Sequence, residues 1–400
     1  MFSTLKIDTG VLKEEFRKEL LFNILPYWTN TMVDEENGGF YGRRDGNDQL
    51  EMKADKAIIL NTRILWTFSR TLNFREERVF HKMADRACSY LLQHFFDPEF
   101  GGVYWTVDYM GNPVQTKKQI YAQAFGIYAL VEYFRATGKK EILTRAIELF
   151  HLIEKHSFDP NDNGYLEAFD RQWNLLQDLR LSDKDANEKK TMNTHLHILE
   201  AYTSLYRSWK DAALKKKLRN LIILFRDKIV SKTFHFNLFF DEKWNVKSHV
   251  ISFGHDIEGS WLLFEAADVL GEENLKQEIK KLCLNMVQQT LQQGFDKDGG
   301  LMNETDELGE LDTDKHWWPQ AEALIGLVNA WQLSSDDNYL EAAIKNWRFI
   351  QEKLVDKRNG EWHWRVNRAG EVCRDEDKAG PWKCPYHNGR AMLELIKRLP

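Results

Sequence analysis

The chain has 400 residues, 43% of them hydrophobic, and a formal net charge of −6. Acidic and basic residues are interspersed, which excludes the concentrated basic face that nucleic-acid binding favours. The most obvious apolar run, Leu221 to Phe225, is far too short to cross a bilayer, so a membrane-spanning protein is excluded as well.

The cysteines and the N-terminal segment indicate the cellular compartment in which the protein is expected. Four scattered cysteines indicate reduced thiols rather than a disulfide framework. The segment Met1–Lys6 leads into the charged Lys13-Glu14-Glu15 without the apolar core of a signal peptide. We therefore expect a soluble, cytoplasmic protein.

A short motif returns about every sixty residues: an aspartate- or asparagine-rich turn that ends in glycine and leads into an aromatic strand. The copies are Glu36-Asn37-Gly38-Gly39-Phe40-Tyr41, Phe100-Gly101-Gly102-Val103-Tyr104-Trp105, Asn163-Gly164-Tyr165-Leu166, Asp298-Gly299-Gly300-Leu301 and Asn359-Gly360-Glu361-Trp362. A degenerate copy without glycine, His235-Phe236-Asn237-Leu238-Phe239, stands fourth in the series. With Gly39, Gly102, Gly164, Leu238, Gly300 and Gly360 as markers, the steps are 63, 62, 74, 62 and 60 residues. Six copies in one chain predict a closed ring.

Paired helical patterns lie between the turns. Apolar positions recur at helical spacing in both members of each pair, but only one member has a wide polar face. The charged helices are expected near 10–30, 76–94, 139–155, 210–229, 273–292 and 336–354. The apolar helices are expected near 53–73, 117–136, 189–208, 253–270, 315–333 and 381–398.

This pattern predicts an all-α fold with an inner ring of six helices inside an outer ring of six. A helix pair cannot bury its apolar face without neighbours, so residues 1–400 are expected to form a single domain. The hairpins should gather at one end and rim a central cavity. The least patterned stretch, 171–190, is interpreted as a long loop over that cavity.

Unusual polar residues stand in the N-terminal halves of the apolar helices, just after the rim hairpins. If these helices form the inner ring, their polar side chains converge on one pocket, and such a pocket is costly unless its groups are paired or used. A lone histidine usually satisfies a carbonyl or lies at the surface, but three at equivalent heights of three inner helices favour function. The content of 14 tryptophans fits a sugar, whose C–H faces stack on indole rings. The polar set comprises Lys56, Arg63, Asn193, His197, His255, Glu258, His316, Glu322, His387 and Arg390.

A metal or cofactor is not expected. His195 and His197 are two residues apart and point to nearly opposite sides of a helix, whereas His255 and Glu258 could share an ion. No further ligand pair is evident. Gly38-Gly39 lies in a hairpin rather than between a strand and a helix, so it is no phosphate loop.

At these residues the chain resembles the cellobiose 2-epimerases of the N-acylglucosamine 2-epimerase superfamily. The resemblance covers nearly the whole chain, and several long motifs occur in order. They are Lys53-Ala54-Asp55-Lys56 through Arg63-Ile64-Leu65-Trp66, Glu167-Ala168-Phe169-Asp170-Arg171-Gln172-Trp173, Met192-Asn193-Thr194-His195-Leu196-His197, Gly254-His255-Asp256-Ile257-Glu258, Trp317-Trp318 through Gln320-Ala321-Glu322, and Gly380-Pro381-Trp382-Lys383-Cys384-Pro385-Tyr386-His387-Asn388-Gly389-Arg390.

The resemblance implies an (α/α)6 barrel and cofactor-free epimerisation at C2 of the reducing-end sugar of β-1,4-linked disaccharides. It implies that His255 and His387 are the two acid/base groups and that Glu258 orients or tunes His255 from one turn away. Further roles follow in the same way. Arg63, Asn193 and His197 would hold O1 and O2, Trp318 and Trp382 would stack on the sugar, and Tyr121, Asp185 and Glu304 would line the pocket or contact the substrate.

Three alternatives stay open. An aldose–ketose isomerase of the same superfamily shares the enediolate intermediate and differs in where the proton returns. A glycoside hydrolase of the same barrel type would need two carboxylates, which Glu258, Glu304 and Glu322 could supply. A non-catalytic sugar-binding protein would leave the three histidines unexplained. We expect a monomer that acts on a small disaccharide; cellobiose, mannobiose and lactose are all candidate substrates.

Overall fold

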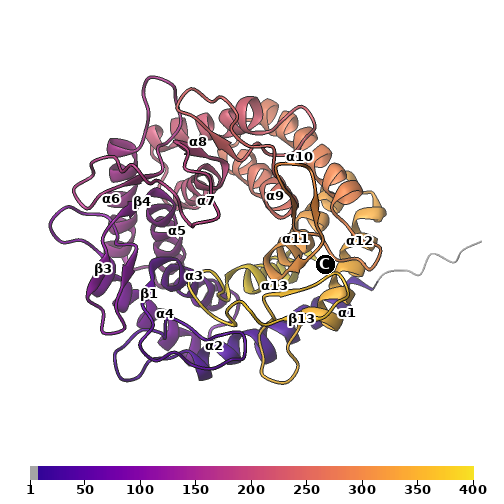
Figure 1. Ribbon diagram of the computed structural model, residues 1–400, viewed down its shortest axis with the longest axis horizontal. Helices are drawn as coiled ribbons and strands as arrows, with labels where there is room; N and C mark the ends of the chain where they lie inside the picture. The colour runs from indigo at the N-terminus through magenta and orange to yellow at the C-terminus, as the bar shows by residue number, and fades with distance from the viewer. Residues whose placement is uncertain (1–7) are drawn as a thin grey trace, which may run out of the picture.

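The computed structural model describes residues 8–400 and forms two concentric rings of helices (Figure 1). Met1–Lys6, on which the absence of a signal peptide was argued, lie outside the described residues. The predicted all-α (α/α)6 barrel is confirmed. The inner helices are α3 (Ile58–Phe74), α5 (Ile120–Thr137), α7 (Met192–Ser208), α9 (Phe253–Leu270), α11 (Trp317–Ser334) and α13 (Tyr386–Arg398).

The outer ring contains the amphipathic helices, and four of its six members include a five-residue π-helical segment. Because their polar faces meet solvent, only one stripe of each is buried. They are α1 (Thr9–Glu19) with η1 (Leu20–Ile24) and α2 (Leu25–Thr31), α4 (Arg78–Tyr90) with η2 (Leu91–Phe95), α6 (Lys140–His156), α8 (Ala212–Leu224) with η3 (Phe225–Ile229), α10 (Glu273–Gln293), and α12 (Asp337–Phe349) with η4 (Ile350–Leu354).

The inner helices are buried almost all round, as their apolar composition predicts. Within α5, every residue from Ile120 to Tyr133 is buried. Both α5 and α9 end at a glycine in the left-handed region, Gly138 and Gly271, where a side chain would be strained. No described helix has the length and apolar character needed to span a bilayer.

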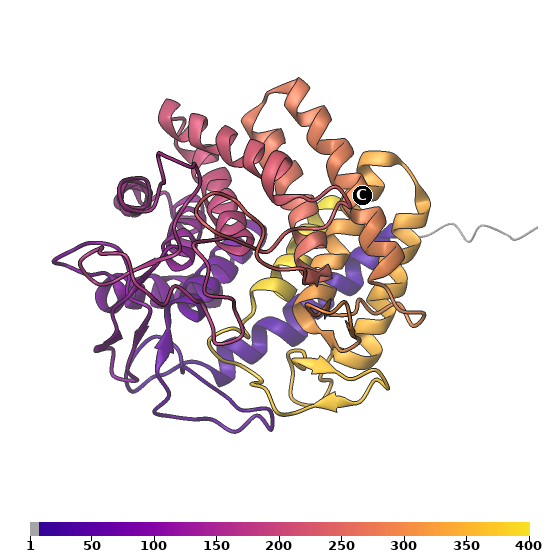
Figure 2. The same cartoon turned by 45° about the horizontal axis from the view of Figure 1, so that its top comes forward.

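Short antiparallel strands join neighbouring repeats at one end of the barrel (Figures 1 and 2). The strand that leads into an inner helix pairs with a hairpin strand of the following repeat, for example Lys56 opposite Val107. The strands are β1 (Lys56–Ala57), β2 (Thr106–Val107), β3 (Pro113–Gln115), β4 (Lys118–Gln119), β5 (Ala168–Phe169), β6 (Lys190–Thr191), β7 (Phe239–Phe240), β8 (Ile251–Ser252), β9 (Glu304–Thr305), β10 (Leu311–Asp312), β11 (Lys315–His316), β12 (Arg365–Val366) and β13 (Val372–Cys373).

The structure corrects the expected starts of five inner helices. The ranges beginning at residues 53, 117, 189, 315 and 381 include strand or turn residues, and the helices begin at Ile58, Ile120, Met192, Trp317 and Tyr386. Before the first four of these helices, the backbone groups pair with a neighbouring repeat, as when the N–H of Ile120 donates to the carbonyl of Glu167 at 2.9 Å. Before the last, the chain forms a turn in which the N–H of Gly380 donates to the carbonyl of Lys383 at 2.9 Å. The helices therefore point their N-terminal ends toward the strands.

The hairpin turns are fastened by a buried lysine–aspartate pair in most repeats. Lys56 Nζ lies 2.7 Å from Asp34, and Lys118, Lys190, Lys315 and Lys378 make the equivalent contacts with Asp97, Asp159, Asp296 and Asp356. In the degenerate fourth repeat Ser231 and Ile251 stand at these positions, so both partners are replaced together. A different buried pair, His235 with Asp256 at 2.7 Å, fastens that turn.

The ring closes between the last repeat and the first. The backbone N–H of Arg44 donates to the carbonyl of Ala379 at 2.7 Å, and Lys13 Nζ donates to the carbonyl of Leu399 at 3.0 Å. That residues 1–400 behave as a single domain stays a prediction.

Candidate active site

Polar side chains from the first two turns of the inner helices meet at the axis of the barrel, at the end that carries the strands. Arg63 of α3 donates to the hydroxyl of Tyr121 of α5 at 2.9 Å. The Tyr121 ring lies 4.8 Å from the imidazole of His197 of α7. The guanidinium of Arg63 also stacks on the ring of Tyr386, 5.0 Å away. The structure thus brings together most of the residues that the sequence singled out.

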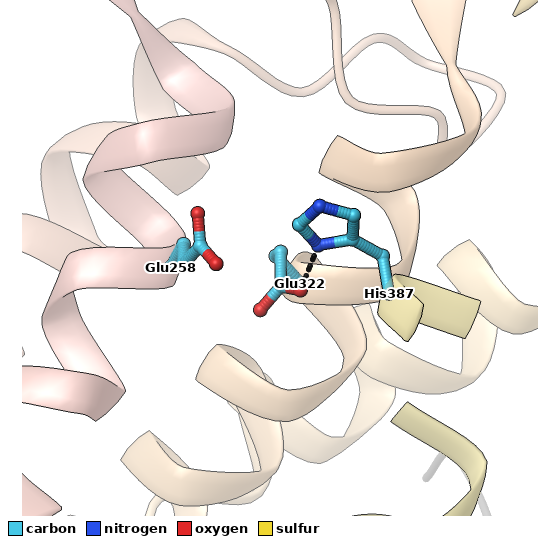
Figure 3. A group of neighbouring side chains, drawn as sticks. All are labelled: Glu258, Glu322 and His387. Atoms are coloured by element: carbon cyan, nitrogen blue, oxygen red, sulfur yellow. Dashed lines mark hydrogen bonds and ion pairs between the residues drawn. The ribbon is translucent and has the colours of Figure 1, made fainter. Parts of the chain in front are cut away.

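His387 of α13 is held by a carboxylate. Its Nδ1 hydrogen bonds with Glu322 of α11 at 2.7 Å, as Figure 3 shows, and its side chain is buried. Burial and the positive charges of Arg63 and Arg390 keep the pKa of His387 well below its ordinary value. The imidazole is therefore neutral at pH 7, and its Nε2 is the nitrogen left for chemistry.

His255 of α9 is held by a hydroxyl instead. Its Nδ1 lies 2.8 Å from Ser252 Oγ, three residues earlier in the chain. The expectation that Glu258 orients His255 is therefore wrong, because Glu258 turns away to bind Arg390 at 2.6 Å. Burial, with a smaller contribution from His197, lowers the pKa of His255 to about 3, so it too is a neutral base at pH 7.

Trp318 lies against both of these histidines. Its indole ring is 4.8 Å from the imidazole of His255 and 5.7 Å from that of His387. The indole, at the start of α11, remains partly exposed. A flat apolar ring that lies against two neutral bases can orient a sugar so that both reach it.

His197 is the third histidine of the site. Its Nδ1 hydrogen bonds with Glu200 at 2.9 Å, and both side chains are buried. Burial alone would raise the pKa of Glu200, but Arg390 and His197 reverse this effect and lower it. Glu200 is thus an ionised acceptor beneath His197.

Glu258, Glu322 and His387 each offer one atom within 4.8 Å of the others, a grouping that could hold a metal ion (Figure 3). Arg390 already donates to both carboxylates at 2.6 Å and supplies the positive charge between them. The Nδ1 of His387 is also already engaged. Burial, and then the charge of Glu322, raise the pKa of Glu258 to about 7. These residues are satisfied by one another and do not fit a resident metal.

Five of the predicted residues lie higher, toward the strands, and are partly exposed. The ring of Trp382 is 6.0 Å from those of Trp105 and Tyr121. Asn193 has a buried Oδ1 without a hydrogen-bond partner among the described residues. The other three of these five residues are Trp318, Asp185 and Glu304, whose side chains are also partly exposed.

Asp185 and Glu304 come from two different loops. Asp185 accepts hydrogen bonds from the backbone and hydroxyl of Ser182 within the 171–190 segment. Glu304 lies in β9, and burial, then the charges of Asp312 and Asp185, raise its pKa. The long-loop interpretation of 171–190 holds, although β6 begins at Lys190.

The sequence did not single out Glu200 or Ser252, and it placed Arg390 in the polar set of the pocket without a role of its own. A signal was present in the spacing. His197 and Glu200, and His387 and Arg390, are each three residues apart on one helix face, and Ser252, which directly precedes α9, lies three residues before His255.

The comparisons with known proteins agree with this geometry. Residues 39–391 match the family model for N-acylglucosamine 2-epimerase. A cellobiose 2-epimerase of Bacteroides fragilis is 52% identical over 96% of this chain and 99% of its own length, and one of Dictyoglomus turgidum is 42% identical over 98% and 100%. The structure of cellobiose 2-epimerase from Bacillus thermoamylovorans superposes with a TM-score of 0.94 at 39% identity, covering 97% of this chain and all of that one. With its six-helix inner ring and its histidine site, the chain belongs to the N-acylglucosamine 2-epimerase family.

Proposed function

We propose that this carbohydrate epimerase inverts C2 of the reducing-end sugar of β-1,4-linked disaccharides, converting cellobiose to glucosyl-mannose. The observation that carries the proposal is the pair of neutral imidazoles, His255 and His387, which both lie against the Trp318 indole. The names of the relatives support cellobiose as a substrate, and lactose and mannobiose share its β-1,4 linkage.

The reaction needs two bases because C2 must lose a proton from one face and regain one on the other. After the ring opens to the aldehyde, one histidine takes the C2 proton through its Nε2 and leaves a cis-enediolate. The other histidine, which has taken up a solvent proton at its Nε2, returns that proton to the opposite face of C2, and the ring closes. The bond between C1 and the ring oxygen opens and re-forms, and the C1–C2 double bond exists only in the enediolate. Exchange of both imidazoles with solvent restores their starting protonation, so atoms and electrons balance. The Nδ1 of His387 donates to Glu322 and the Nδ1 of His255 hydrogen bonds with Ser252 Oγ, and these contacts fix both rings for this task.

The enediolate carries negative charge on O1 and O2, and buried donors stabilise such charge strongly. Arg63 and His197 are buried at the axis, and the Asn193 side chain lies beside them on α7. Tyr121 holds Arg63 in place at 2.9 Å. The second sugar would lie toward the partly exposed Trp382, Asp185 and Glu304.

Proton exchange with solvent tests the mechanism. Cellobiose incubated with the enzyme in deuterated water should give glucosyl-mannose that carries deuterium at C2 of the reducing unit and none in the non-reducing ring. Nuclear magnetic resonance of the product reads both positions. An aldose–ketose isomerase would place deuterium at C1 of a ketose, and a hydrolase would release glucose without carbon-bound label. Epimer without deuterium at C2 would exclude two solvent-exchangeable bases.

We further propose that the reaction needs neither metal nor cofactor, since Arg390 supplies the charge that a cation would bring to Glu258 and Glu322. Activity should be unchanged after treatment with a chelator and desalting, with metal content measured by mass spectrometry. A loss that one divalent ion restores would assign the ion to Glu258, Glu322 and His387 instead.

A further inference from the structure

Three buried carboxylates face one buried guanidinium beneath the histidines. Arg390 of α13 donates through Nη1 to Glu200 of α7 and through Nη2 to Glu258 of α9 and Glu322 of α11, the last two at 2.6 Å. All four side chains are at most 3% exposed. One carboxylate would be enough to neutralise the guanidinium, and apolar residues in place of the whole cluster are often just as stable. Stability alone therefore does not explain three carboxylates around one arginine. Four inner helices meet at this arginine.

The same contacts form an unbroken chain of hydrogen bonds between two histidines of the site. His197 Nδ1 bonds with Glu200 at 2.9 Å, and Arg390 joins Glu200 to Glu322. Glu322 then bonds with His387 Nδ1 at 2.7 Å. The Tyr386 hydroxyl also donates to Glu200 at 2.6 Å. The Nδ1 atoms of His197 and His387 therefore each hydrogen bond with a carboxylate that also binds Arg390.

We propose that Arg390 is a positioning residue for catalysis: it holds Glu200 and Glu322 as acceptors, so that His197 and His387 keep their protons on Nδ1 and present Nε2 to the sugar. This inference rests on the proposed function of the site. Arg390 itself does not touch the reacting atoms, because the carboxylates stand between it and both imidazoles.

The shape of the guanidinium suits this role and an ammonium does not. Arg390 uses two nitrogens of one plane for three carboxylates, which a single lysine nitrogen cannot reproduce. The plane also packs against the rings of Tyr386 and Trp261, with its carbon 4.3 Å and 4.8 Å from their centroids. Trp261 Nε1 in turn donates to Glu322 at 3.0 Å, which fixes the carboxylate from a second side.

The pH dependence of such a network reflects every ionisable group that faces it. Arg390 and Arg63 both lower the pKa of His387, after burial, and Arg390 also counters the rise in the pKa of Glu258. The groups that face the network are Arg63 from α3, Tyr121 and Tyr128 from α5, His197 and Glu200 from α7, His255 and Glu258 from α9, Glu322 from α11, and Tyr386, His387 and Arg390 from α13.

Two substitutions test the inference. Arg390→Lys keeps the positive charge and loses the planar guanidinium with its two donor nitrogens. We expect kcat for cellobiose to fall by roughly 10²-fold or more while KM changes only a few-fold. Arg390→Met removes the charge, so the acidic limb of the pH–kcat profile should move to higher pH because the pKa of His387 rises. If Arg390→Met does not fold, Arg390→Lys still decides the question through kcat and KM.

Arg70→Lys is the matched control. Arg70 of α3 also bridges two carboxylates, Glu132 at 3.3 Å and Glu394 at 3.0 Å, but lies two turns away from Arg63 and outside the site. We expect Arg70→Lys to lower thermal stability and to leave kcat and its pH profile unchanged. The inference is overturned if Arg390→Lys retains wild-type kcat and pH profile, or if its loss matches that of Arg70→Lys. The wild-type enzyme is assayed in parallel, so absence of any epimerisation would reject the proposed function rather than the role of Arg390.

Discussion

His195 and His197 stand two residues apart on α7, and their partners differ completely. The Nε2 of His195 accepts the backbone N–H of Tyr165 at 2.9 Å and so fastens a hairpin turn. His197 points into the site and bonds with Glu200. Helical spacing already predicted that they face opposite sides. It could not tell which one fastens the fold, because that depends on a hairpin thirty residues earlier.

The two proposed acid/base residues can be tested by single substitutions. His255→Asn and His387→Asn should each lower kcat by roughly 10²–10⁴-fold, the usual contribution of a positioned acid or base, while the dissociation constant for cellobiose changes little. Steady-state kinetics and calorimetric binding measure the two quantities separately. Near-normal turnover in either variant would exclude that histidine from proton transfer.

His195→Gln is the control for these variants. Gln123 and Gln320 accept the equivalent N–H groups of Val103 and Leu301 at 2.7 Å, so a glutamine can replace the contact of His195. We expect kcat to stay close to that of the wild type. A fall comparable to that of His387→Asn would mean that helix placement, not proton transfer, explains the loss.

Glu167 makes a pH-dependent contribution to stability. It is fully buried and accepts the backbone N–H of Thr191 and the hydroxyl of Thr194, and burial raises its pKa from 4.5 to about 8. The folded state therefore binds a proton that the unfolded state releases, and stability falls as pH rises from 4.5 to 8. In Glu167→Gln this fall should be smaller, as measured by urea unfolding at several pH values. An unchanged pH dependence would show that Glu167 is ionised in the fold.

At the scale of elements, the buried lysine–aspartate pairs hold each hairpin against the helix that follows. Lys56 and Asp34 are at most 1% exposed and 2.7 Å apart. Removing one partner of such a pair leaves an uncompensated buried charge, which costs about 3–5 kcal/mol. Lys56→Ile should therefore lower the free energy of unfolding by about that amount, measured by urea denaturation.

The fourth repeat indicates which second substitution should compensate for the loss of Lys56. It has Ser231 and Ile251 in place of the pair, and it folds with the same geometry. Adding Asp34→Ser to Lys56→Ile should recover part of the lost stability, since no buried charge remains unpaired. Lys53→Ile, at an exposed position nearby, serves as the control. A double variant less stable than the single one would contradict this account.

The sequence predicted the order and type of all twelve helical elements, because hydrophobic periodicity is a local signal. It did not predict where five of the inner helices begin. Residues such as Lys118 and Gln119 look helical by local pattern, yet they pair with Phe169 and Ala168 of the next repeat. The marker Leu238 also lies three residues too late in the fourth copy, because the bridge between Val230 and Phe236 makes His235 the counterpart of Gly300. Both errors arise from contacts made with distant residues.

The site was predictable where chemistry and helix position coincide. Arg63, His197, His255 and His387 lie in the first two turns of inner helices, and a ring of helices brings these turns together. The hydrogen-bond partners of the histidines were harder to predict, because a histidine has several neighbours at suitable spacing. Glu258 lies three residues after His255, as Ser252 lies three before it, and only the direction of each side chain decides between them.

At the scale of the whole molecule, the ring leaves no repeat with a free face. An open array of repeats can unfold from its ends, because each repeat contacts only its neighbours. Here Trp28 in the first outer element donates to Glu361 in the last repeat at 2.8 Å, and Lys383 and Asn388 donate to the same carboxylate. The first and last repeats therefore stabilise each other.

We expect residues 1–400 to unfold in one transition, with the calorimetric enthalpy equal to the van't Hoff enthalpy. Glu361→Gln leaves Lys383 buried without its ion pair, a change that costs about 3–5 kcal/mol, so the whole transition should move to lower temperature and remain single. Glu14→Gln, which removes an exposed pair with Arg17, is the control and should shift it little. Two separate transitions in the wild type would contradict the single domain. An early, separate transition only in Glu361→Gln would show instead that the ring can open at the contact between its first and last repeats.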